Sequence, residues 1–375
     1  MTISRVAVLG AGNGGCATAA DLAIRGFETR LYSRSEETLE PLRRRGGIEL
    51  VEDGQEALGQ PDLITSALED AVAGADLVTI AAPAVAHEFM ARALAPLLTE
   101  DQMVHLNPGQ TGGTLHFVHE LRRAGCRIPV RCCETVTLTC ICRMAGPARV
   151  EIYRRTANLG CAAFPAESAP DLLPAVAGVF PNVVPAENVL DTGLSNINAI
   201  MHPAGMVGNA GWIEQHHGDL LFYRQALSPS VARMIHGVDR ERLAIVRALG
   251  LRPRTFVEIF HAAGLTSDAA LETGDIFQAT QESEPNKTII APTTHDHRYV
   301  HEDVGYGLVP MAELASLLDI DTPVIDALIT LASEMNGVDY RRTGLTLAGM
   351  GLEDADSAAL RQILQSGFPD SQVHA

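Results

Sequence analysis

The amino-acid sequence predicts a doubly wound α/β domain with a mostly parallel sheet, followed by an all-α domain. Three observations support this prediction. The chain has 375 residues, a length that suits two domains of ordinary size. Short apolar runs alternate with helical patterns over residues 1–150. Beyond residue 182 strand-like segments nearly vanish, so we expect one domain over residues 1–182 and a second over residues 183–375.

Four apolar runs in the first domain end in turn residues and are typical of strands: 5–10, 28–34, 75–83 and 102–109. Helical patterns separate them: 16–26, 35–46 and 87–98. Alternation of this kind indicates right-handed βαβ units and a parallel sheet. Three more strand-like segments are expected to extend the same sheet: 130–136, 148–154 and 158–165.

The second domain carries helical periodicity after a linker-like segment at 180–193. The clearest predicted helices are 228–250, 311–320 and 322–337. The last of these begins with Thr322 as N-cap and Pro323 at the first helical position, and Gly337 can close it.

The composition is that of a globular protein, with 46% apolar and 20% charged residues. A net charge of −18 repels phosphate backbones, so nucleic acid is not expected as a partner. No apolar segment is long enough to span a bilayer, and the N-terminus lacks a signal-peptide pattern. The seven cysteines lack zinc-ribbon spacing and are expected to be reduced and buried. These features predict a cytoplasmic protein without a membrane partner.

A glycine motif near the N-terminus predicts a dinucleotide site of the Rossmann type. Gly10, Gly12 and Gly15 follow a predicted strand and open a predicted helix. Gly10 permits the tight turn, Gly12 lets a pyrophosphate approach the backbone, and Gly15 lets helix and strand pack closely. The helix N-terminus adds free N–H groups for the phosphates. Asn13 and Gly14, in the same turn, are also candidate cofactor-binding residues.

The end of the second predicted strand bears on the choice of cofactor. It carries Ser33 and Arg34, and no acid follows until Glu36. A carboxylate here would bind the ribose 2′-hydroxyl of NAD, whereas a hydroxyl and a guanidinium favour the 2′-phosphate of NADP. We therefore expect NADP as cofactor. NAD remains an alternative in which Arg34 stacks on the adenine.

Two later loops, 82–87 and 107–113, are expected along the nicotinamide half of the cofactor, at the carboxyl edge of the sheet. Pro83 is a candidate cofactor-binding residue in the first loop. His87 could contact a ligand, or it could simply begin the next helix.

The segment "SNINAIMHPAGMVGNAGW" opens the second domain. Asn198 and His202 are four positions apart and share one helix face. Pro203 removes one helical hydrogen bond, and the many small residues allow a neighbour to come close. A lone histidine in an apolar helix is either a core residue or a catalytic one, and this segment alone leaves both open.

The segment "THDHRYVHEDVGYGLVP" has two interpretations. His295, His297 and His301 could hold a metal. Alternatively, the segment is a substrate loop in which Arg298 binds an anion and one acid supports a distant base.

Five motifs together show a family resemblance: "GAGNGG", "APAVAH", "ETVTLTCICR", "NINAIMHP" and "RYVHEDVGYGLVP". In order and spacing the chain resembles the octopine/nopaline (opine) dehydrogenase family over nearly its whole length. The family joins a Rossmann domain to a helical domain. Its members use NADH or NADPH to reduce the imine formed between an α-keto acid and the amino group of an amino acid.

The resemblance implies that His202 is catalytic, that Asp303 is its acidic partner, and that Arg298 binds a substrate carboxylate. It thus favours the substrate loop, with no metal, and it implies a homodimer. Asn198 is a further candidate for substrate binding. The chemistry agrees, because reduction of an imine needs a proton source, and histidine titrates in the useful range. A carboxylate on its other nitrogen would fix the tautomer, and arginine binds carboxylates in bidentate fashion.

Three departures from the family pattern bear on substrate and cofactor: Gly305 in place of a proline, the strand end "LYSR", and the glycine-rich segment 107–113. One alternative function is an NADP-dependent 2-keto acid or 2-hydroxy acid reductase without an amine partner. Another is a sensor that binds a dinucleotide without turnover, which would have no use for His202 with Asp303.

Overall fold

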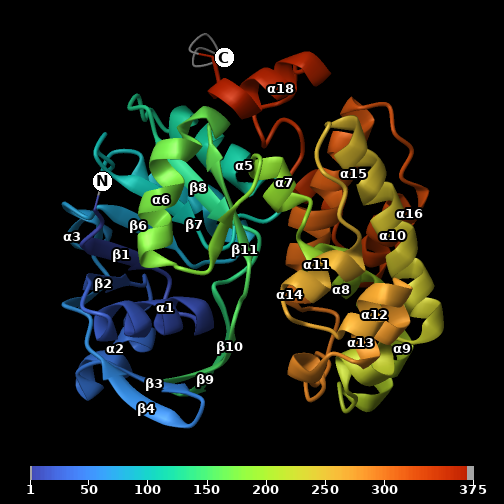
Figure 1. Ribbon diagram of the computed structural model, residues 1–375, viewed down its shortest axis with the longest axis horizontal. Coiled ribbons are helices and arrows are strands. Elements are labelled where there is room, and N and C mark those ends of the chain that lie inside the picture. Colours follow the sequence, from blue (N-terminus) through green and yellow to red (C-terminus); the bar gives the residue numbers. More distant parts are fainter. Residues whose placement is uncertain (1, 370–375) are drawn as a thin grey trace. The chain divides into compact units, whose positions relative to one another are not determined.

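The computed structural model describes residues 2–369. The chain divides into two compact units (Figure 1). Of the described residues, the first unit comprises 2–109, 114–192 and 363–369, and the second comprises 110–113 and 193–362. Residues 183–192 group with the first unit, unlike in the sequence-based division, because β12 (Val183–Pro185) pairs with a strand of that unit.

The first unit is built on an eight-stranded sheet in the order β12-β11-β8-β7-β6-β1-β2-β5. Neighbouring strands run parallel except β8 and β11, as predicted for a mostly parallel sheet. The bounds of the seven strands other than β12 are β1 Arg5–Leu9, β2 Glu28–Tyr32, β5 Leu63–Thr65, β6 Leu77–Ile80, β7 Met103–Leu106, β8 Arg131–Thr135 and β11 Leu159–Phe164.

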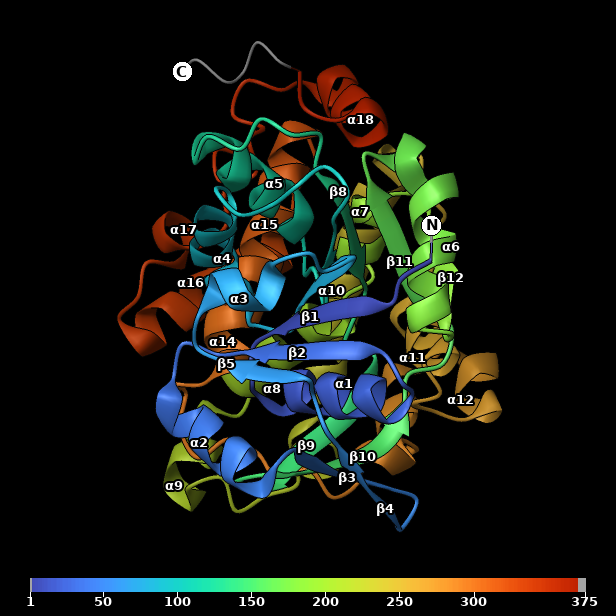
Figure 2. The ribbon, with the colours of Figure 1, turned by 90° about the vertical axis from the view of Figure 1, so that its left-hand side faces the viewer.

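Helices cover both faces of this sheet, as the doubly wound prediction requires. Figure 2 shows α1 on one side of β1 and β2 and α3 on the other. The helices are α1 Asn13–Ile24, α2 Glu36–Arg45, α3 Leu68–Val72, α4 His87–Leu94, α5 Gly113–Arg123, α6 Ala169–Val179 and α7 Val189–Gly193.

A second sheet of four strands, in the order β4-β3-β10-β9, is not predicted by the sequence patterns. Its strands are β3 Ile48–Glu52, β4 Gln55–Gly59, β9 Cys140–Gly146 and β10 Arg149–Arg155. The expectation that 148–154 extends the main sheet is therefore wrong, because β10 pairs with β3 and β9 instead. The other two segments do extend the main sheet, as β8 and β11. The Asp53–Gly54 turn, with both φ angles positive, is the hairpin signal that sequence reasoning missed.

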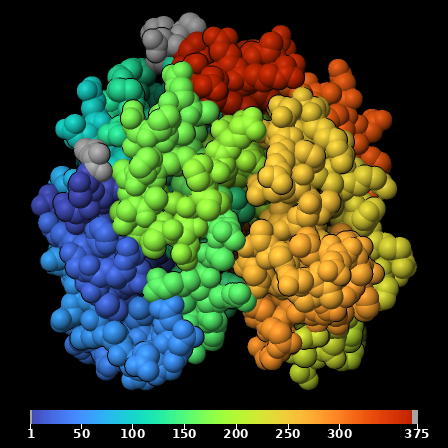
Figure 3. All heavy atoms as spheres, viewed as in Figure 1, coloured from blue at the N-terminus to red at the C-terminus, as the bar shows by residue number. Residues whose placement is uncertain are grey.

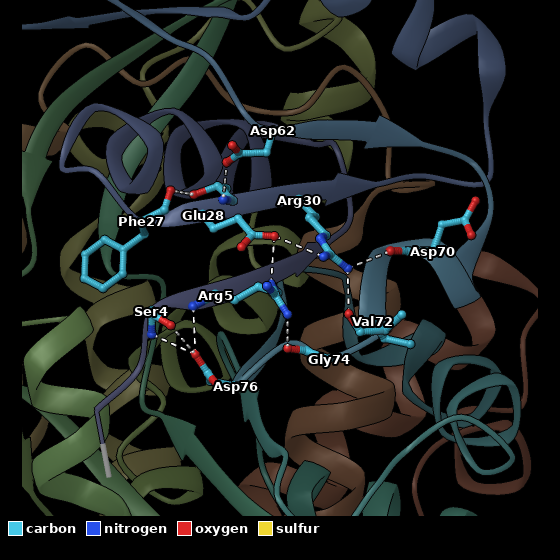
Figure 4. A network of polar contacts seen from close by, with 12 residues as sticks. Ser4, Arg5, Phe27, Glu28, Arg30, Asp62, Asp70, Val72, Gly74 and Asp76 are labelled. Atoms are coloured by element: carbon cyan, nitrogen blue, oxygen red, sulfur yellow. Dashed lines mark hydrogen bonds and ion pairs between the residues drawn. The ribbon is translucent and has the colours of Figure 1, made fainter.

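Polar side chains tie together the amino ends of the first two strands (Figure 4). The Asp76 carboxylate accepts the backbone N–H groups of Ser4 and Arg5, each at 2.8 Å. Arg5 and Arg30 both contact Glu28, at 2.7 and 3.0 Å, and their hydrogen bonds hold the pKa of Glu28 below its usual value despite the opposing effect of burial. This network lies at the edge opposite to the one where doubly wound folds bind ligands. We assign it a structural role.

The second unit is helical, as predicted. In the described part of this unit the isolated pairing of Leu221 with Ile290 is the one β-bridge. The predicted helix at 322–337 is α16, which begins after Thr322 and ends at Gly337 with φ of 63°. The other helices are α8 Ile197–Val207, α9 Ala210–His216, α10 Pro229–Ala248, α11 Phe256–Ala262, α12 Asp268–Thr273, α13 Ile276–Gln281, α14 Arg298–Asp303, α15 Val309–Leu317, α17 Tyr340–Thr343 and α18 Ser357–Ser366.

Figure 3 shows the heavy atoms of the molecule as spheres; blue to green marks most of the first unit, and yellow to orange marks much of the second.

All seven cysteines are buried free thiols. Among the described residues, no helix is long and apolar enough to cross a membrane.

Glu134 is a fully buried acid near the carboxyl end of β8. Its carboxyl group accepts hydrogen bonds from the backbone and hydroxyl of Thr114 and from the hydroxyl of Thr192. Burial raises the pKa of Glu134 to about 7, although these hydrogen bonds oppose the rise. The folded protein therefore holds a proton on Glu134 at pH values where the unfolded chain has lost it.

This difference predicts a pH-dependent stability. Between about pH 4.5 and pH 7 Glu134 by itself makes the folded state bind one proton more than the unfolded state, so its contribution to the free energy of unfolding falls as pH rises. The contribution of Glu134 is about 1.4 kcal/mol per pH unit in this window. Urea unfolding of wild type and Glu134→Gln across pH 4.5–7.5 measures it. The free energy of unfolding of wild type minus that of the variant should fall as pH rises across this window; parallel curves for the two proteins would contradict the assignment.

Candidate functional site

The turn between β1 and α1 requires glycine at two of the three motif positions. Gly10 has φ of +114°, and a Cβ there would lie 2.5 Å from the Ala81 carbonyl oxygen. A Cβ on Gly15 would lie 1.7 Å from the carbonyl oxygen of Gly10. The loop after β6 and the first turn of α1 therefore press against the β1–α1 turn from two sides.

Gly12 differs, because a Cβ on it would meet no atom within 4 Å. It is the N-cap of α1, and neither a capping side chain nor an acid in the first turn occupies the free backbone N–H groups. Open space beside unpartnered N–H groups at a helix N-terminus fits the pyrophosphate of a dinucleotide. The residues present thus fit the cofactor that the sequence predicts.

Asn13 and Gly14, the other two candidates in this turn, contact neighbouring residues of the first unit. The side-chain oxygen of Asn13 accepts a hydrogen bond from the backbone of Met144 at 2.9 Å. A Cβ on Gly14 would lie 2.7 Å from the Leu138 side chain. Both residues therefore hold the start of α1 against residues 138–144.

Arg34 lies just beyond the end of β2 and is exposed. Its guanidinium lies 5.4 Å from the centre of the Phe89 ring and makes no ion pair with any residue that the structure describes. The Ser33 hydroxyl accepts a hydrogen bond from the backbone of Ser35 at 3.3 Å. The nearest acid in sequence, Glu36, is paired with Arg43. The Arg34 guanidinium is thus an exposed positive charge that no described acid pairs with.

Pro83 and His87 lie in the connection between β6 and α4. Pro83 is exposed and precedes a 3₁₀ turn at Ala84–Ala86. His87 is the first residue of α4 and is fully buried, and neither ring nitrogen has a hydrogen-bond partner among the described residues. Burial, with a smaller effect of His116, lowers the pKa of His87 to about 3. A histidine that stays neutral and unpaired is unsuited to donating a proton.

In the second unit, α8 carries His202 and is approached closely on two sides. A Cβ on Gly205 would lie 2.6 Å from the Phe222 ring, and a Cβ on Gly307 would lie 2.5 Å from the Cβ of Ala199. Phe222 and Gly307 belong to two π-helical turns, Phe222–Ala226 and Val304–Leu308. Turns of this kind are frequent at functional sites.

His202 and Asp303 meet within the second unit. Nδ1 of His202 lies 2.8 Å from a carboxylate oxygen of Asp303, and both side chains are buried. An ionised carboxylate can only accept, so this contact calls for a proton on Nδ1, and Nε2 of an imidazole with that single proton is an acceptor. Nε2 lies 3.2 Å from the hydroxyl of Tyr223. The Tyr299 ring stacks on the imidazole at 3.7 Å between centroids, with an interplanar angle of 15°.

Arg298 begins α14, one turn before Asp303, and α14 packs against α8 (Figure 1). Its Nε and Nη2 donate to one carboxylate oxygen of Glu302, at 3.1 and 2.7 Å. Burial lowers the pKa of Arg298, but the Glu302 and Asp303 carboxylates raise it by more, so the net shift is upward and the guanidinium stays charged. The Arg298 side chain is 53% exposed and that of Glu302 only 4%. Arg298 is therefore held by a buried acid and keeps an exposed surface for an anion.

Glu302 also connects Arg298 to the start of α8. Its second carboxylate oxygen accepts from the Gln110 side chain at 3.4 Å, and Gln110 in turn accepts from Asn196, the N-cap of α8. Sequence reasoning missed Glu302, Gln110 and Tyr223. Glu302 could have been identified, because it lies four positions after Arg298 and therefore on the same helix face.

Asn198, the remaining substrate candidate, is half-buried in the first turn of α8. Its backbone N–H donates to Asn196 at 3.1 Å, and its side chain makes no hydrogen bond with the described residues. The side-chain amide is thus available to a ligand.

The three histidines that suggested a metal have separate partners. His295 contacts the carbonyl of Ala210, His297 accepts from the backbone of Tyr299, and His301 contacts Asp296 and Tyr340. Within residues 2–369, no group of three or more potential metal ligands is found.

Comparison with known proteins gives a consistent result. Residues 185–336 match the family model of the α-helical domain of NAD/NADP octopine/nopaline dehydrogenases, and residues 5–132 match the N-terminal domain of NAD-dependent glycerol-3-phosphate dehydrogenases. An opine dehydrogenase of Arthrobacter sp. (strain 1C) is 34% identical over 359 residues, covering 96% of this chain and 98% of its own. The protein ocs of Agrobacterium tumefaciens (strain Ach5) is 27% identical over 96% of this chain and 99% of its own.

Among solved structures, an octopine dehydrogenase in complex with NADH and agmatine superposes with a TM-score of 0.78 at 22% identity, covering 97% of this chain and 98% of its own. A yersinopine dehydrogenase with bound NADP⁺ superposes with a TM-score of 0.73 at 16% identity, covering 99% of each chain.

The contrast between Gly12 and Gly15 gives a prediction. Gly12→Ala should fold with wild-type stability but should bind the dinucleotide at least about tenfold more weakly, because the added methyl group enters the space left for the pyrophosphate. Gly15→Ala should instead lower the thermal midpoint, because its Cβ collides with backbone. Fluorescence titration with NADPH and a thermal melt of each variant measure the two effects. Unchanged NADPH affinity in a folded Gly12→Ala would contradict the assignment.

Proposed function

The chain belongs to the octopine/nopaline (opine) dehydrogenase family, and we propose that it condenses an α-keto acid with the amino group of an amino acid by reducing the resulting imine. It is an NAD(P)-dependent oxidoreductase, and we propose NADP as the preferred cofactor. The observation that carries the proposed reaction is the buried contact between His202 and Asp303, one helical turn from Arg298.

The proposed roles follow from the chemistry of imine formation and reduction. The reduced nicotinamide supplies a hydride when it is bound. His202 supplies the proton that the condensation needs, and Asp303 holds its tautomer and supports the protonated ring. Arg298 binds the keto-acid carboxylate through its exposed surface, and Asn198 contributes a polar contact to the substrate. Gly10, Gly12 and Gly15 form the turn that receives the dinucleotide.

Solved relatives support the two substrate classes. Octopine dehydrogenase structures have been determined with NADH and L-arginine, with NADH and agmatine, and with NADH and pyruvate. Apart from NADH, these ligands are two amines, L-arginine and agmatine, and one keto acid, pyruvate. We extend only the classes to this chain, an amino acid and an α-keto acid.

Product analysis tests the proposed reaction against its alternatives. Wild type is incubated with NADPH and a panel of keto acids, with and without amino acids, and the products are identified by mass spectrometry. A secondary amine that forms only when both substrates are present supports the proposal. A 2-hydroxy acid formed without any amine would show the simple reductase, and cofactor binding without any product would show the sensor.

We also propose that the protein acts in the cytoplasm as a homodimer. Seven buried free thiols support a reducing compartment, and the dimer follows from the family resemblance. Light scattering at several concentrations measures the assembly state.

Substitutions in the His202–Asp303 pair give a prediction. His202→Ala should retain cofactor affinity but lose turnover by roughly 10²–10⁴, the usual contribution of a positioned acid–base group. Asp303→Asn should keep the shape but lose rate as well, because the charge that supports protonated His202 is gone. Steady-state kinetics and cofactor titration measure both effects. His236→Ala, at an exposed position on α10, is the matched control. Wild-type turnover by His202→Ala would contradict the assigned role.

The uncommitted guanidinium of Arg34 predicts cofactor preference. NADPH should bind more tightly than NADH, and Arg34→Asp should weaken NADPH binding alone, by about 1.5–3 kcal/mol for one lost charge-assisted contact. Titration of both cofactors measures this. Arg44→Asp, at an arginine of α2 whose side chain is 77% exposed, controls for the change in net charge. Equal affinities of wild type for NADH and NADPH would contradict the prediction.

A further inference from the structure

The imidazole of His202 is held in one orientation. Asp303 binds Nδ1, and the Tyr299 ring covers one face of the imidazole. The Phe222 ring approaches edge-on, at 5.7 Å between centroids and 70° between planes. Rotation of the imidazole would break the contact with Asp303 and the stacking on Tyr299. The direction in which Nε2 points is therefore set by the protein.

The hydroxyl of Tyr223 lies close to Nε2, at 3.2 Å. An imidazole nitrogen has a single lone pair or N–H bond, which lies in the plane of the ring. A hydroxyl 3.2 Å from Nε2 is close enough to form a hydrogen bond with it. A tyrosine hydroxyl can donate and accept at once, so it can take one proton while releasing another.

Contacts of Tyr223 and of its neighbours hold the π-helical turn Phe222–Ala226 in place. The backbone carbonyl of Tyr223 accepts from the Gln281 side chain at 3.1 Å. The amide of Asn209 bonds the carbonyls of Gly205 and Ala226, at 2.7 and 2.8 Å, and so joins α8 to the π-helical turn that contains Tyr223. Phe222 packs in the space that Gly205 leaves on α8. These contacts place the hydroxyl relative to the helix that carries His202.

We propose that the Tyr223 hydroxyl relays the proton between Nε2 of His202 and the substrate, which makes Tyr223 a further catalytic residue. The inference rests on the proposed condensation of a keto acid with an amine. In the dehydration step the amine nitrogen of the carbinolamine forms a C=N bond, and the C–O bond breaks. The departing hydroxyl takes the Tyr223 proton and leaves as water, while Tyr223 regains a proton from protonated His202. The protonated imine then accepts the hydride at carbon, and its C=N electrons become the nitrogen lone pair.

Removal of one oxygen atom tests the relay. Tyr223→Phe keeps the ring and its packing, and it should lower the single-turnover rate of condensation about 10²-fold while cofactor affinity stays at the wild-type value. Tyr153→Phe, on β10 with a side chain that is largely exposed, is the matched control for loss of a tyrosine hydroxyl. A Tyr223→Phe rate within about twofold of wild type would overturn the proposal, because the substrate would then displace the hydroxyl and bond His202 directly.

A second measurement follows how the single-turnover rate of wild type and of Tyr223→Phe depends on the deuterium fraction of the solvent. The proposed relay moves two protons together, so a plot of the wild-type rate against deuterium fraction should be curved. Tyr223→Phe removes one of the two proton transfers, so its plot should be straight. A straight line or no dependence in wild type would overturn the relay. The outcome for the proposed function is separate. If condensation occurs and depends on His202 but not on Tyr223, only the relay fails, whereas absence of any secondary amine product means that the proposed function fails.

Discussion

The hydrogen bond between His202 and Asp303 is the interaction on which the arrangement of the second unit depends. Both groups are buried, and a buried polar or charged group is costly unless it is paired. The helix that carries Asp303 must therefore lie against α8. Gly307 permits the close approach, because a Cβ on it would lie 2.5 Å from the Cβ of Ala199 on α8.

A similar use of glycine shapes the cofactor turn, with a different outcome at each position. Gly10 and Gly15 are required by the backbone that packs on them, whereas Gly12 faces open space. Gly10 and Gly15 thus fix the shape of the turn, whereas Gly12 leaves space for a ligand. The same separation appears in the ion pair of the second unit, where the buried Glu302 orients and the half-exposed Arg298 remains accessible. In a chain with a net charge of −18, an anionic ligand needs a local cation, and we propose Arg298 and Arg34 for this role.

The parts of the structure that the sequence predicts are those encoded by short segments. The glycine motif, the alternation of strands with helices and the limits of α16 are all local, and the main sheet follows from them. The second sheet is not local, because β3 pairs with β10, about a hundred residues away. Apolar alternation identifies a strand but not its partner, which is why the pattern at 148–154 wrongly predicts a place in the main sheet.

The candidate site shows the same limit. Motifs identify His202, Asp303 and Arg298, and the structure brings the first two into contact. Tyr223 comes from a segment with no motif, and Gln110 comes from the loop 107–113, which the sequence predicts to lie beside the cofactor; only the fold places them beside His202 and Glu302. For Asn13 and His87 sequence reasoning could not anticipate burial or a structural hydrogen bond, because both depend on neighbours that are distant in sequence.

The central claim is that His202 and Asp303 act as one catalytic unit. A double-mutant cycle on kcat/KM for condensation, with His202→Ala, Asp303→Asn and the combined variant, tests it most directly. Residues that act as a unit are not additive, so the combined variant should be about as slow as His202→Ala alone. If instead the two losses multiply, each residue acts independently, and the claim that the buried pair works as a unit is contradicted.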